Sequence, residues 1–333
     1  MKLNFNRKTV ALVLFGAAIF LLIANLTLIV FEPKTKRNSE EIKISDNEID
    51  SLFHLSLSSF GIRESWIKEN RKIKNIKSYR VKVPLDLSIP VILAELNSNF
   101  WDTHVIFNTV EKEFSGKTIL EINFNERVRL KAEFDYDDNI NRSGGSMAFV
   151  LENFELSSNI DSLLLEIPEP FSLLLIPSTK NFELSNYILN KNKTYTLLLN
   201  DDISELKYKL RSSYSIDRLK GSLQSIINDF STATFFVIDD ESDLYNSDVF
   251  TFIGSELLKR KIRTVKLSNL IRLNSGNQEA LTISFDNYLK EVQEDYKPTF
   301  LINASDFMNL IPEIKRYTKI GYILVHPSEI LLK

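Results

Sequence analysis

The chain contains no cysteine, only 9 glycines and only 3 histidines in 333 residues. Without cysteine it can form no disulfide, no thiolate-bound metal centre and no thiol nucleophile. The glycines form neither a G-x-G-x-x-G nor a G-x-x-x-x-G-K loop, so the usual phosphate-binding loops are missing. The histidines lie far apart and form no H-E-x-x-H zinc motif. A net charge of −3 argues against a dedicated nucleic-acid binder, so we expect no nucleic-acid partner.

The rest of the composition is that of an ordinary globular protein. Hydrophobic residues make up 44% and charged residues 26%, which excludes wholesale disorder. At about 100–200 residues per domain, the length allows two domains, or one large domain with an appendage.

Residues 9–31 form one apolar run without a charge. The run exceeds the about 20 residues that a helix needs to cross a bilayer. It is also longer than a usual signal-peptide core and ends without an A-x-A-like cleavage site, so we favour an uncleaved anchor over a signal peptide. We therefore expect residues 1–8 to be a cytoplasmic tail, 9–31 a transmembrane signal anchor and 32–45 a linker.

The orientation of this anchor does not follow from charge, because basic residues flank the run almost equally. The short N-terminal tail and the long globular part favour a body outside the cytoplasm. The sequence thus predicts a single-pass protein of the bacterial inner membrane with a periplasmic, extracytoplasmic C-terminal body. The lack of cysteine is compatible with an oxidising compartment.

Residues 46–140 are predicted to form a small α+β domain. Helical spacing begins near Asn47, behind a capping Asp46, and we expect it to continue through Glu64–Lys72. A second helix is expected at Pro90–Leu96. Strands are expected at Tyr79–Pro84, His104–Val110, Thr118–Phe124 and Val128–Phe134, the last two forming a hairpin.

Two further features of this domain are ambiguous. His54 and His104 are expected to be structural or surface residues rather than metal ligands. The basic run Trp66–Lys77 is expected to be a solvated helix face, although contact with anionic lipid or an anionic envelope polymer is an alternative.

Residues 146–333 alternate short apolar runs with amphipathic segments, which predicts an α/β fold with strands buried on both faces. Strands are expected at Met147–Leu151, Phe171–Ile176, Tyr195–Leu199, Ala233–Ile238, Arg263–Leu267, Ala280–Ser284, Thr299–Ile302 and Tyr322–Val325. Helices are expected at Glu183–Leu189, Ile203–Arg211, Leu223–Asp229, Asp248–Lys259, Asn287–Glu294 and Asp306–Tyr317. Eight strands over this length favour a compact (β/α) barrel with its site in the loops that follow the strands.

Four stretches of this region occur in a recognisable order. They are AFVLENFE at 148–155, LLLIP at 173–177, FFVID at 235–239 and GYILVHP at 321–327. Together they resemble the divergent polysaccharide deacetylase family over about residues 146–330. That resemblance implies an irregular (β/α) barrel preceded by the small domain and the membrane helix.

The resemblance also implies a chemistry, the hydrolysis of an N-acetyl group on a sugar. In that family a divalent metal held by Asp and two His activates water, and a neighbouring carboxylate acts as base. The family's paired acid falls here on Glu152 and Asn153, its two histidines on Leu198 and Leu219, and a later acid on Asn303. Leucine binds no metal, so we expect the zinc site to be lost, with no cofactor and no metal ligand.

Only His326 occupies a family-matching polar position, and alone it cannot support the reaction. It is expected to be hydrogen-bonded beside the final Pro turn, and Asp239 is the Asp near the end of the strand FFVID. No catalytic residue is therefore assigned with conviction among Glu152, Asn153, Asp239 and His326.

Two acidic groups follow expected strands, Asp201-Asp202 and Asp239-Asp240-Glu241. Such carboxylates could perform acid/base chemistry or bind a divalent cation if they converge at one barrel end. They could equally cap helices or lie in solvated loops. Asp201, Asp202 and Asp240 are accordingly candidate substrate-binding residues.

Three functions remain open. The first is a membrane-anchored envelope pseudoenzyme that binds a glycan or a protein without catalysis. The second is an active hydrolase of carbohydrate amide (C–N) bonds that uses the remaining carboxylates. The third is a structural envelope component.

Overall fold

The computed structural model describes residues 44–70, 76–112, 116–142, 144–156, 159–273, 276–291 and 297–333. The expected tail, the apolar run 9–31 and nearly all of the linker lie outside the described residues. In the described part of the chain, no helix combines the length and the apolar character needed to cross a membrane. The chain divides into two units between Ser45 and Asp46, and the helices and strands that the structure describes belong to the second unit, Asp46–Lys333.

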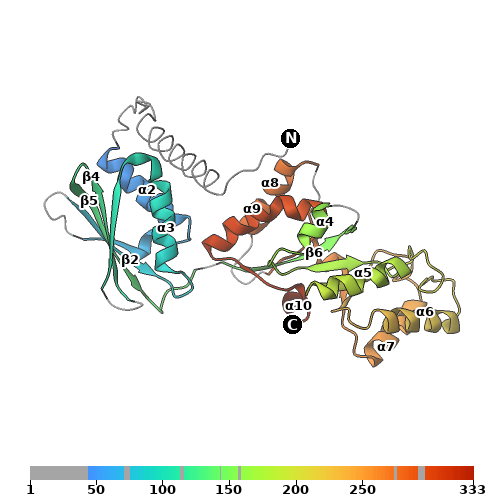
Figure 1. Ribbon diagram of the computed structural model, residues 1–333. Coiled ribbons are helices and arrows are strands. Elements are labelled where there is room, and N and C mark those ends of the chain that lie inside the picture. The colour runs from blue at the N-terminus through green and yellow to red at the C-terminus, as the bar shows by residue number, and fades with distance from the viewer. Residues whose placement is uncertain are drawn as a thin grey trace, which may run out of the picture. The chain divides into compact units, whose positions relative to one another are not determined.

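The first sheet is small and mixed (Figure 1). Its strands run in the order β1-β2-β5-β4-β3, and only β2 and β5 pair in parallel. The elements are α2 (Asp46–Ser58), β1 (Ile67–Glu69), β2 (Lys77–Val83), α3 (Ile89–Asn99), β3 (Ile106–Glu111), β4 (Thr118–Phe124) and β5 (Arg127–Tyr136). Helix α2 packs Phe53 against Tyr79 of β2 and Phe134 of β5, with ring centroids 5.4 and 6.4 Å away.

Most of the small-domain predictions are confirmed, with one correction. The hairpin between β4 and β5 has the two-residue turn Asn125-Glu126, and both residues have positive φ, 51° and 58°. The predicted continuation of the first helix through Glu64–Lys72 is wrong. Gly61 turns the chain at φ 73°, a short 3-10 helix follows at Glu64–Trp66, and β1 comes next. The expected helix face on the basic run is therefore a strand at Ile67–Glu69, and residues 71–75 lie outside the described residues.

The second sheet is parallel and holds most of the core. Its strands run in the order β10-β9-β8-β7-β6-β12-β11, and β13 joins the beginning of β6. The strands are β6 (Ser146–Glu152), β7 (Ser172–Leu175), β8 (Thr194–Leu199), β9 (Phe236–Ile238), β10 (Thr264–Lys266), β11 (Ile271–Arg272), β12 (Thr299–Asn303) and β13 (Ile323–Leu324). The helices are α4 (Asn159–Leu164), α5 (Thr179–Asn190), α6 (Ile216–Asp229), α7 (Val249–Lys259), α8 (Gln278–Glu291), α9 (Ala304–Ile320) and α10 (Pro327–Leu331).

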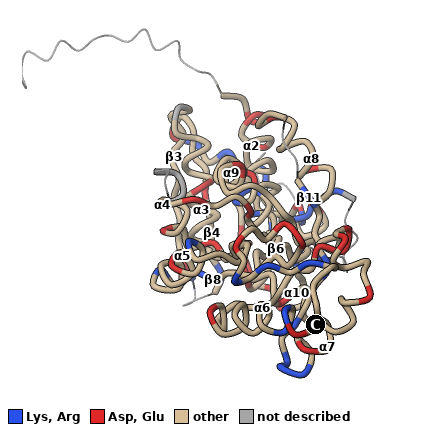
Figure 2. Tube along the Cα trace, turned by 90° about the vertical axis from the view of Figure 1, so that its right-hand side faces the viewer, with Lys and Arg blue, Asp and Glu red and all other residues tan. Residues whose placement is uncertain are grey.

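Alternate residues of these strands are buried on opposite faces, as the continuous apolar runs predict. One face packs against the helices; there Phe149, Leu197 and Phe300 join a cluster that includes Phe307 of α9. The other, inner face is a smaller cluster of Val150, Leu174, Phe235, Val237, Val265, Leu270 and Leu301. Charged residues of both signs are interspersed along the described chain (Figure 2).

The predicted barrel is only partly confirmed, because the hydrogen-bonded sheet is an open half-barrel. Strands β10 and β11 form its two edges and do not pair with each other. They are consecutive in the chain, joined by the 3-10 turn Leu267–Asn269. The segment 264–272 therefore runs from one edge of the sheet to the other. The barrel is closed by this connecting segment and not by hydrogen bonds between β10 and β11.

Two predicted elements of this region are wrong. Ala280–Ser284 is not a strand but part of α8, whose buried residues Leu281, Phe285 and Leu289 recur every four residues; a five-residue window does not reveal that period. Ile203–Arg211 forms irregular turns rather than a helix. The short elements α4, β11 and α10 have no counterpart among the predictions.

Candidate functional site

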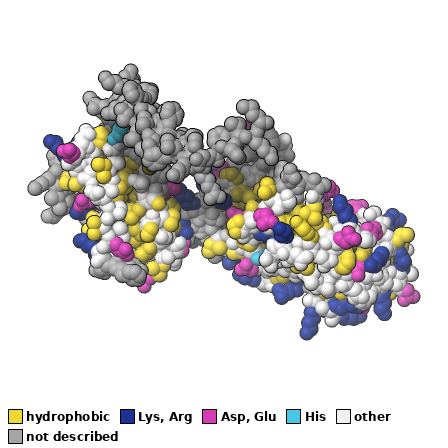
Figure 3. Space-filling model, in the orientation of Figure 1, with side chains coloured by type: hydrophobic (Ala, Val, Ile, Leu, Met, Phe, Trp, Pro, Cys, Tyr) yellow, Lys and Arg dark blue, Asp and Glu magenta, His cyan; other side chains and the backbone are white. Residues whose placement is uncertain are grey.

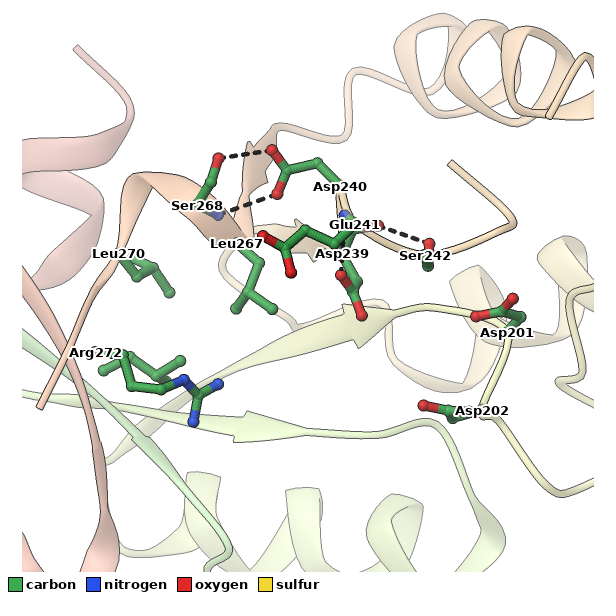
Figure 4. A pocket seen from close by; sticks show the side chains of 11 residues that line it. Asp201, Asp202, Asp239, Asp240, Glu241, Ser242, Leu267, Ser268, Leu270 and Arg272 are labelled. Atoms are coloured by element: carbon green, nitrogen blue, oxygen red, sulfur yellow. Dashed lines mark hydrogen bonds between the residues drawn. The ribbon is translucent and has the colours of Figure 1, made fainter. Parts of the chain in front are cut away.

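A pocket of about 400 Å³ lies where strands of the parallel sheet end (Figure 4). Carboxyl ends of parallel strands are where α/β folds place their ligands. Its walls come from the loop after β8, the loop after β9, the 3-10 turn, β11 and β12. The lining residues are Asp201, Asp202, Asp239, Asp240, Glu241, Ser242, Leu267, Ser268, Leu270, Arg272 and Leu301. The structure thus brings together the two acidic groups that the sequence only suggested might converge.

Asp240 links two walls of this pocket through hydrogen bonds. Its carboxylate accepts hydrogen bonds from the Ser268 backbone N–H at 3.0 Å and from the Ser268 hydroxyl at 2.6 Å. The hydroxyl bond is the main reason that the pKa of Asp240 is below its ordinary value. Asp240 therefore stays ionised while it ties the loop after β9 to the turn that closes the half-barrel.

Asp239 shapes the loop in which it lies. Its Oδ1 accepts from the Glu241 backbone N–H at 3.2 Å, and its carbonyl accepts from the Ser242 hydroxyl at 2.6 Å. Such local bonds are typical of an Asx-type turn. They fix the direction of the acidic loop before any ligand arrives.

The pocket combines an acidic rim with an apolar floor. Asp202 and Arg272 lie on opposite sides and point toward the middle (Figure 4). Leu301 and Leu270 are 1% and 6% exposed and belong to the inner cluster of the sheet. A ligand with an apolar surface and outward-pointing hydroxyl or amino groups matches this arrangement.

The positions that the deacetylase resemblance assigns to a paired acid are engaged with neighbours. Glu152 ends β6, and its carboxylate accepts a hydrogen bond from the Arg272 guanidinium. Asn153 follows at φ 55° and donates from Nδ2 to the Asn303 Oδ1 at 2.6 Å. Both side chains therefore link β6 to neighbouring parts of the sheet.

Leu198 and Leu219, where the resemblance places histidines, are not brought together. Leu198 is half-buried on β8 and packs against the inner cluster. Leu219 is completely buried on α6, in the cluster that fills the helix-covered face. The two side chains consequently lie on opposite faces of the sheet.

His326 lies away from the pocket, beside the first residue of β8. Its Nε2 is 2.5 Å from the Thr194 hydroxyl, and its Nδ1 accepts from the Ser328 backbone N–H at 3.3 Å, which caps α10. Glu329 completes the capping box by accepting from the His326 backbone N–H. Burial lowers the pKa of His326, so the ring is held neutral as a structural cap.

A metal, which the resemblance implies, does not fit these residues. Within the described ranges, no group of three or more His, Asp or Glu side chains is arranged to hold an ion. The carboxylates around the pocket are divided between structural bonds and the solvent-facing rim. We therefore derive no chemical step through a metal.

No family model and no curated protein matches the chain. The chain is similar in structure to CE4 polysaccharide deacetylases, at low sequence identity. The catalytic domain of a peptidoglycan N-acetylglucosamine deacetylase from Eubacterium rectale matches at 9% identity and a TM-score of 0.39, over 57% of this chain and 91% of that one. A wild-type CE4 family pseudoenzyme from Bacillus anthracis matches at 12% and 0.39, over 72% and 95%.

An uncharacterized protein from Agrobacterium tumefaciens also matches, at 12% identity and a TM-score of 0.40, over 59% of this chain and 92% of that one. At identities this low, the similarity concerns the fold and not the site.

Sequence reasoning missed the residues of the closing segment, above all Arg272 and Ser268. The stretch Leu270–Leu273 carries a weak strand signal, because Arg272 is a single charge among apolar residues, and it could have identified β11. Nothing in the sequence indicates that Ser268 would meet Asp240, because that contact depends on how the half-barrel closes.

Proposed function

We propose that this protein is a membrane-anchored envelope protein whose half-barrel binds an amine-bearing glycan without hydrolysing it. The observation that carries the proposal is the acidic pocket at the carboxyl edge of the sheet. The apolar run 9–31 supports the anchor, and the long C-terminal body supports a location outside the cytoplasm.

The chemistry of the pocket favours a cationic sugar. Its volume of about 400 Å³ is in the ordinary range for small-ligand sites, about 300–1,000 Å³. Leu270 and Leu301 offer an apolar floor to the C–H face of a pyranose ring. Asp201, Asp202 and Glu241 can accept hydrogen bonds from hydroxyl groups, and they attract an ammonium group more strongly than an uncharged acetamide.

The engagement of Glu152 supports binding rather than catalysis. A general base must reach the proton or the water that it activates. Glu152 is instead ion-paired with Arg272, and Asn153 offers no carboxylate. A protein of this design retains a scaffold and a pocket but offers no activated nucleophile.

Binding is tested by titrating the full-length, detergent-solubilised chain with glucosamine oligomers and with N-acetylglucosamine oligomers. We expect the amine-bearing oligomers to bind more tightly, and salt to weaken the binding because the attraction is electrostatic. Asp201→Asn combined with Asp202→Asn should weaken it by about tenfold, the equivalent of about 1.4 kcal/mol. Asp243→Asn is the matched control, because this exposed carboxylate lies beside the acidic loop but does not line the pocket. Equal binding of both oligomers would refute the proposed ligand class.

Catalysis is tested on the same preparation by measuring acetate release from N-acetylglucosamine oligomers, with and without added zinc. We expect no turnover in either case. Zinc-dependent release that is lost in Glu152→Gln or Asp239→Asn would establish the hydrolase alternative instead. Protease accessibility of the body in intact and in permeabilised cells tests the proposed orientation.

A further inference from the structure

Strand β3 is an outer edge of the small sheet. In the part of the chain that the structure describes, no strand pairs with its outer side. Five of its six residues are exposed, and its sequence IFNTVE contains no proline or lysine. Natural proteins usually protect an edge strand with such residues or with a bulge, because its free N–H and C=O groups can pair with another chain.

The outward-facing apolar residues of β3 lie on the sheet face opposite the helices. Ile106 and Val110 pair with Asn123 and Ile119 of β4, whereas the alternate β4 residues Leu120 and Ile122 are completely buried. Ile106 is 63% exposed and Val110 is 59% exposed. Hydrophobic side chains are exposed on the part of the molecule that holds this sheet (left in Figure 3).

We propose that two copies of this chain dimerise by antiparallel pairing of β3 with β3, centred on Asn108. A two-fold axis normal to the sheet relates two such strands, so each face of one sheet continues into the same face of the other. The two five-stranded sheets then become one continuous sheet, and the two exposed edges are removed together.

The register follows from the alternation of side chains. Directly opposite residues of an antiparallel pair share a face, so the centre must fall on a residue and not between two residues. Centring on Asn108 places Ile106 opposite the partner's Val110, and Val110 opposite the partner's Ile106. Both exposed apolar side chains of each copy are then covered, which a centre on Phe107 or Thr109 does not achieve.

The charges of this strand are also compatible with the register. Glu111 is the only charged residue of β3, and a centre on Asn108 does not place it opposite the partner's Glu111. The pairing therefore brings no like charges of the two strands together. The β3 edge is thus complementary to itself, and this complementarity identifies a second copy as its partner.

Disulfide trapping tests the register in the full-length chain, which contains no cysteine of its own. Asn108→Cys should form a linked dimer on oxidation, because opposite Cα atoms in a sheet lie within disulfide range. Thr109→Cys is the matched control, one residue away on the same strand, and its diagonal partner lies too far. We expect about tenfold less linked dimer for Thr109→Cys on a non-reducing gel. Ile106→Cys and Val110→Cys should link only when the two variants are mixed.

Charge substitutions in the Asn108→Cys background test the same register, so that the conclusion does not rest on one variant alone. Ile106→Lys with Val110→Lys places ammonium groups opposite each other and should abolish trapping. Ile106→Lys with Val110→Glu places opposite charges together and should restore it. The proposal is overturned if Asn108→Cys forms no linked dimer, if Thr109→Cys links equally well, or if both charge variants behave alike. Contact through another part of the chain would give linkage without this register dependence.

Discussion

The Arg272 guanidinium on β11 donates a hydrogen bond to the Glu152 carboxylate at the end of β6. Strand β12 lies between these two strands, so the ion pair spans three strands of the parallel sheet. It also joins the half-barrel to the segment that closes it. Arg272 also lines the pocket. A change to this ion pair should therefore alter both the stability of the closed half-barrel and the net charge that the pocket presents to a ligand.

Breaking this pair should cost a modest amount of stability. The Arg272 and Glu152 side chains are 43% and 18% exposed, so solvent screens part of their attraction. We expect Arg272→Gln to lower the free energy of unfolding by about 0.5–1 kcal/mol in urea denaturation. A double-mutant cycle with Glu152→Gln should show a coupling of similar size. Strictly additive effects of the two substitutions would show that the pair contributes nothing.

The same two substitutions should have opposite effects on ligand binding. Arg272→Gln removes the positive charge from the pocket and should tighten the binding of glucosamine oligomers. Glu152→Gln releases Arg272 toward the ligand and should weaken it. Calorimetric titration measures both, with Asp243→Asn as the control. A change in the same direction for both variants would contradict the charge argument.

Histidine at the two leucine positions should not restore a metal site. Leu219 is completely buried in the core, so Leu219→His should cost about 2–4 kcal/mol, whereas Leu198→His, at a half-buried position, should cost less. The side chains lie on opposite faces of the sheet, so the double variant should bind no stoichiometric zinc. Unfolding curves and elemental analysis measure these two outcomes. Tight zinc binding by the double variant would show that the two positions can meet.

The sequence predicted the fold best where one physical signal dominates. Strict alternation identified β4 and β5, and continuous apolar runs identified β6, β7, β8 and β12. It failed at 280–284, because so short a window does not show the four-residue spacing of Leu281, Phe285 and Leu289, which is the buried side of α8. The open half-barrel was not predictable either, because two-residue β11 and the turn at Leu267–Asn269 are defined by tertiary contacts.

The acidic residues of the candidate site were predictable, but the residues of the closing segment and the bonds between the two were not. Asp201, Asp202, Asp239 and Asp240 follow strands, and the rule that such residues meet at one edge holds here. Which of these carboxylates forms a structural hydrogen bond depends on partners that are distant in the sequence. Ser268 engages Asp240, and no local pattern indicates it.

Acid should weaken the attachment of the C-terminal helix through His326. Burial lowers the pKa of the folded His326 below 6.5, so as the pH falls the unfolded chain takes up this proton first. The contribution of this group to stability is therefore complete above about pH 6.5 and declines below it. Protonation at Nδ1 would also remove the acceptor for the Ser328 N–H.

Thermal unfolding at pH 7.5 and pH 5.5 tests this dependence. His326→Asn supplies an uncharged capping oxygen, so it should lose less stability than the unmodified chain over the same pH interval. His104→Asn, the same substitution at an exposed position outside this cap, is the matched control. An identical pH dependence in His326→Asn and the unmodified chain would exclude His326 as its source.

The turn between β4 and β5 offers a stabilising substitution. Asn125 and Glu126 both have positive φ, as a type I′ turn requires, and Glu126 is exposed. A glutamate is strained in this conformation, whereas glycine adopts it freely. We expect Glu126→Gly to raise the free energy of unfolding by about 0.5–1 kcal/mol in urea denaturation. Glu121→Gly in the middle of β4 is the control and should lower it, because it weakens the strand and removes the bond from Lys131. A loss of stability in Glu126→Gly would mean that its carboxylate contributes more than the backbone strain costs.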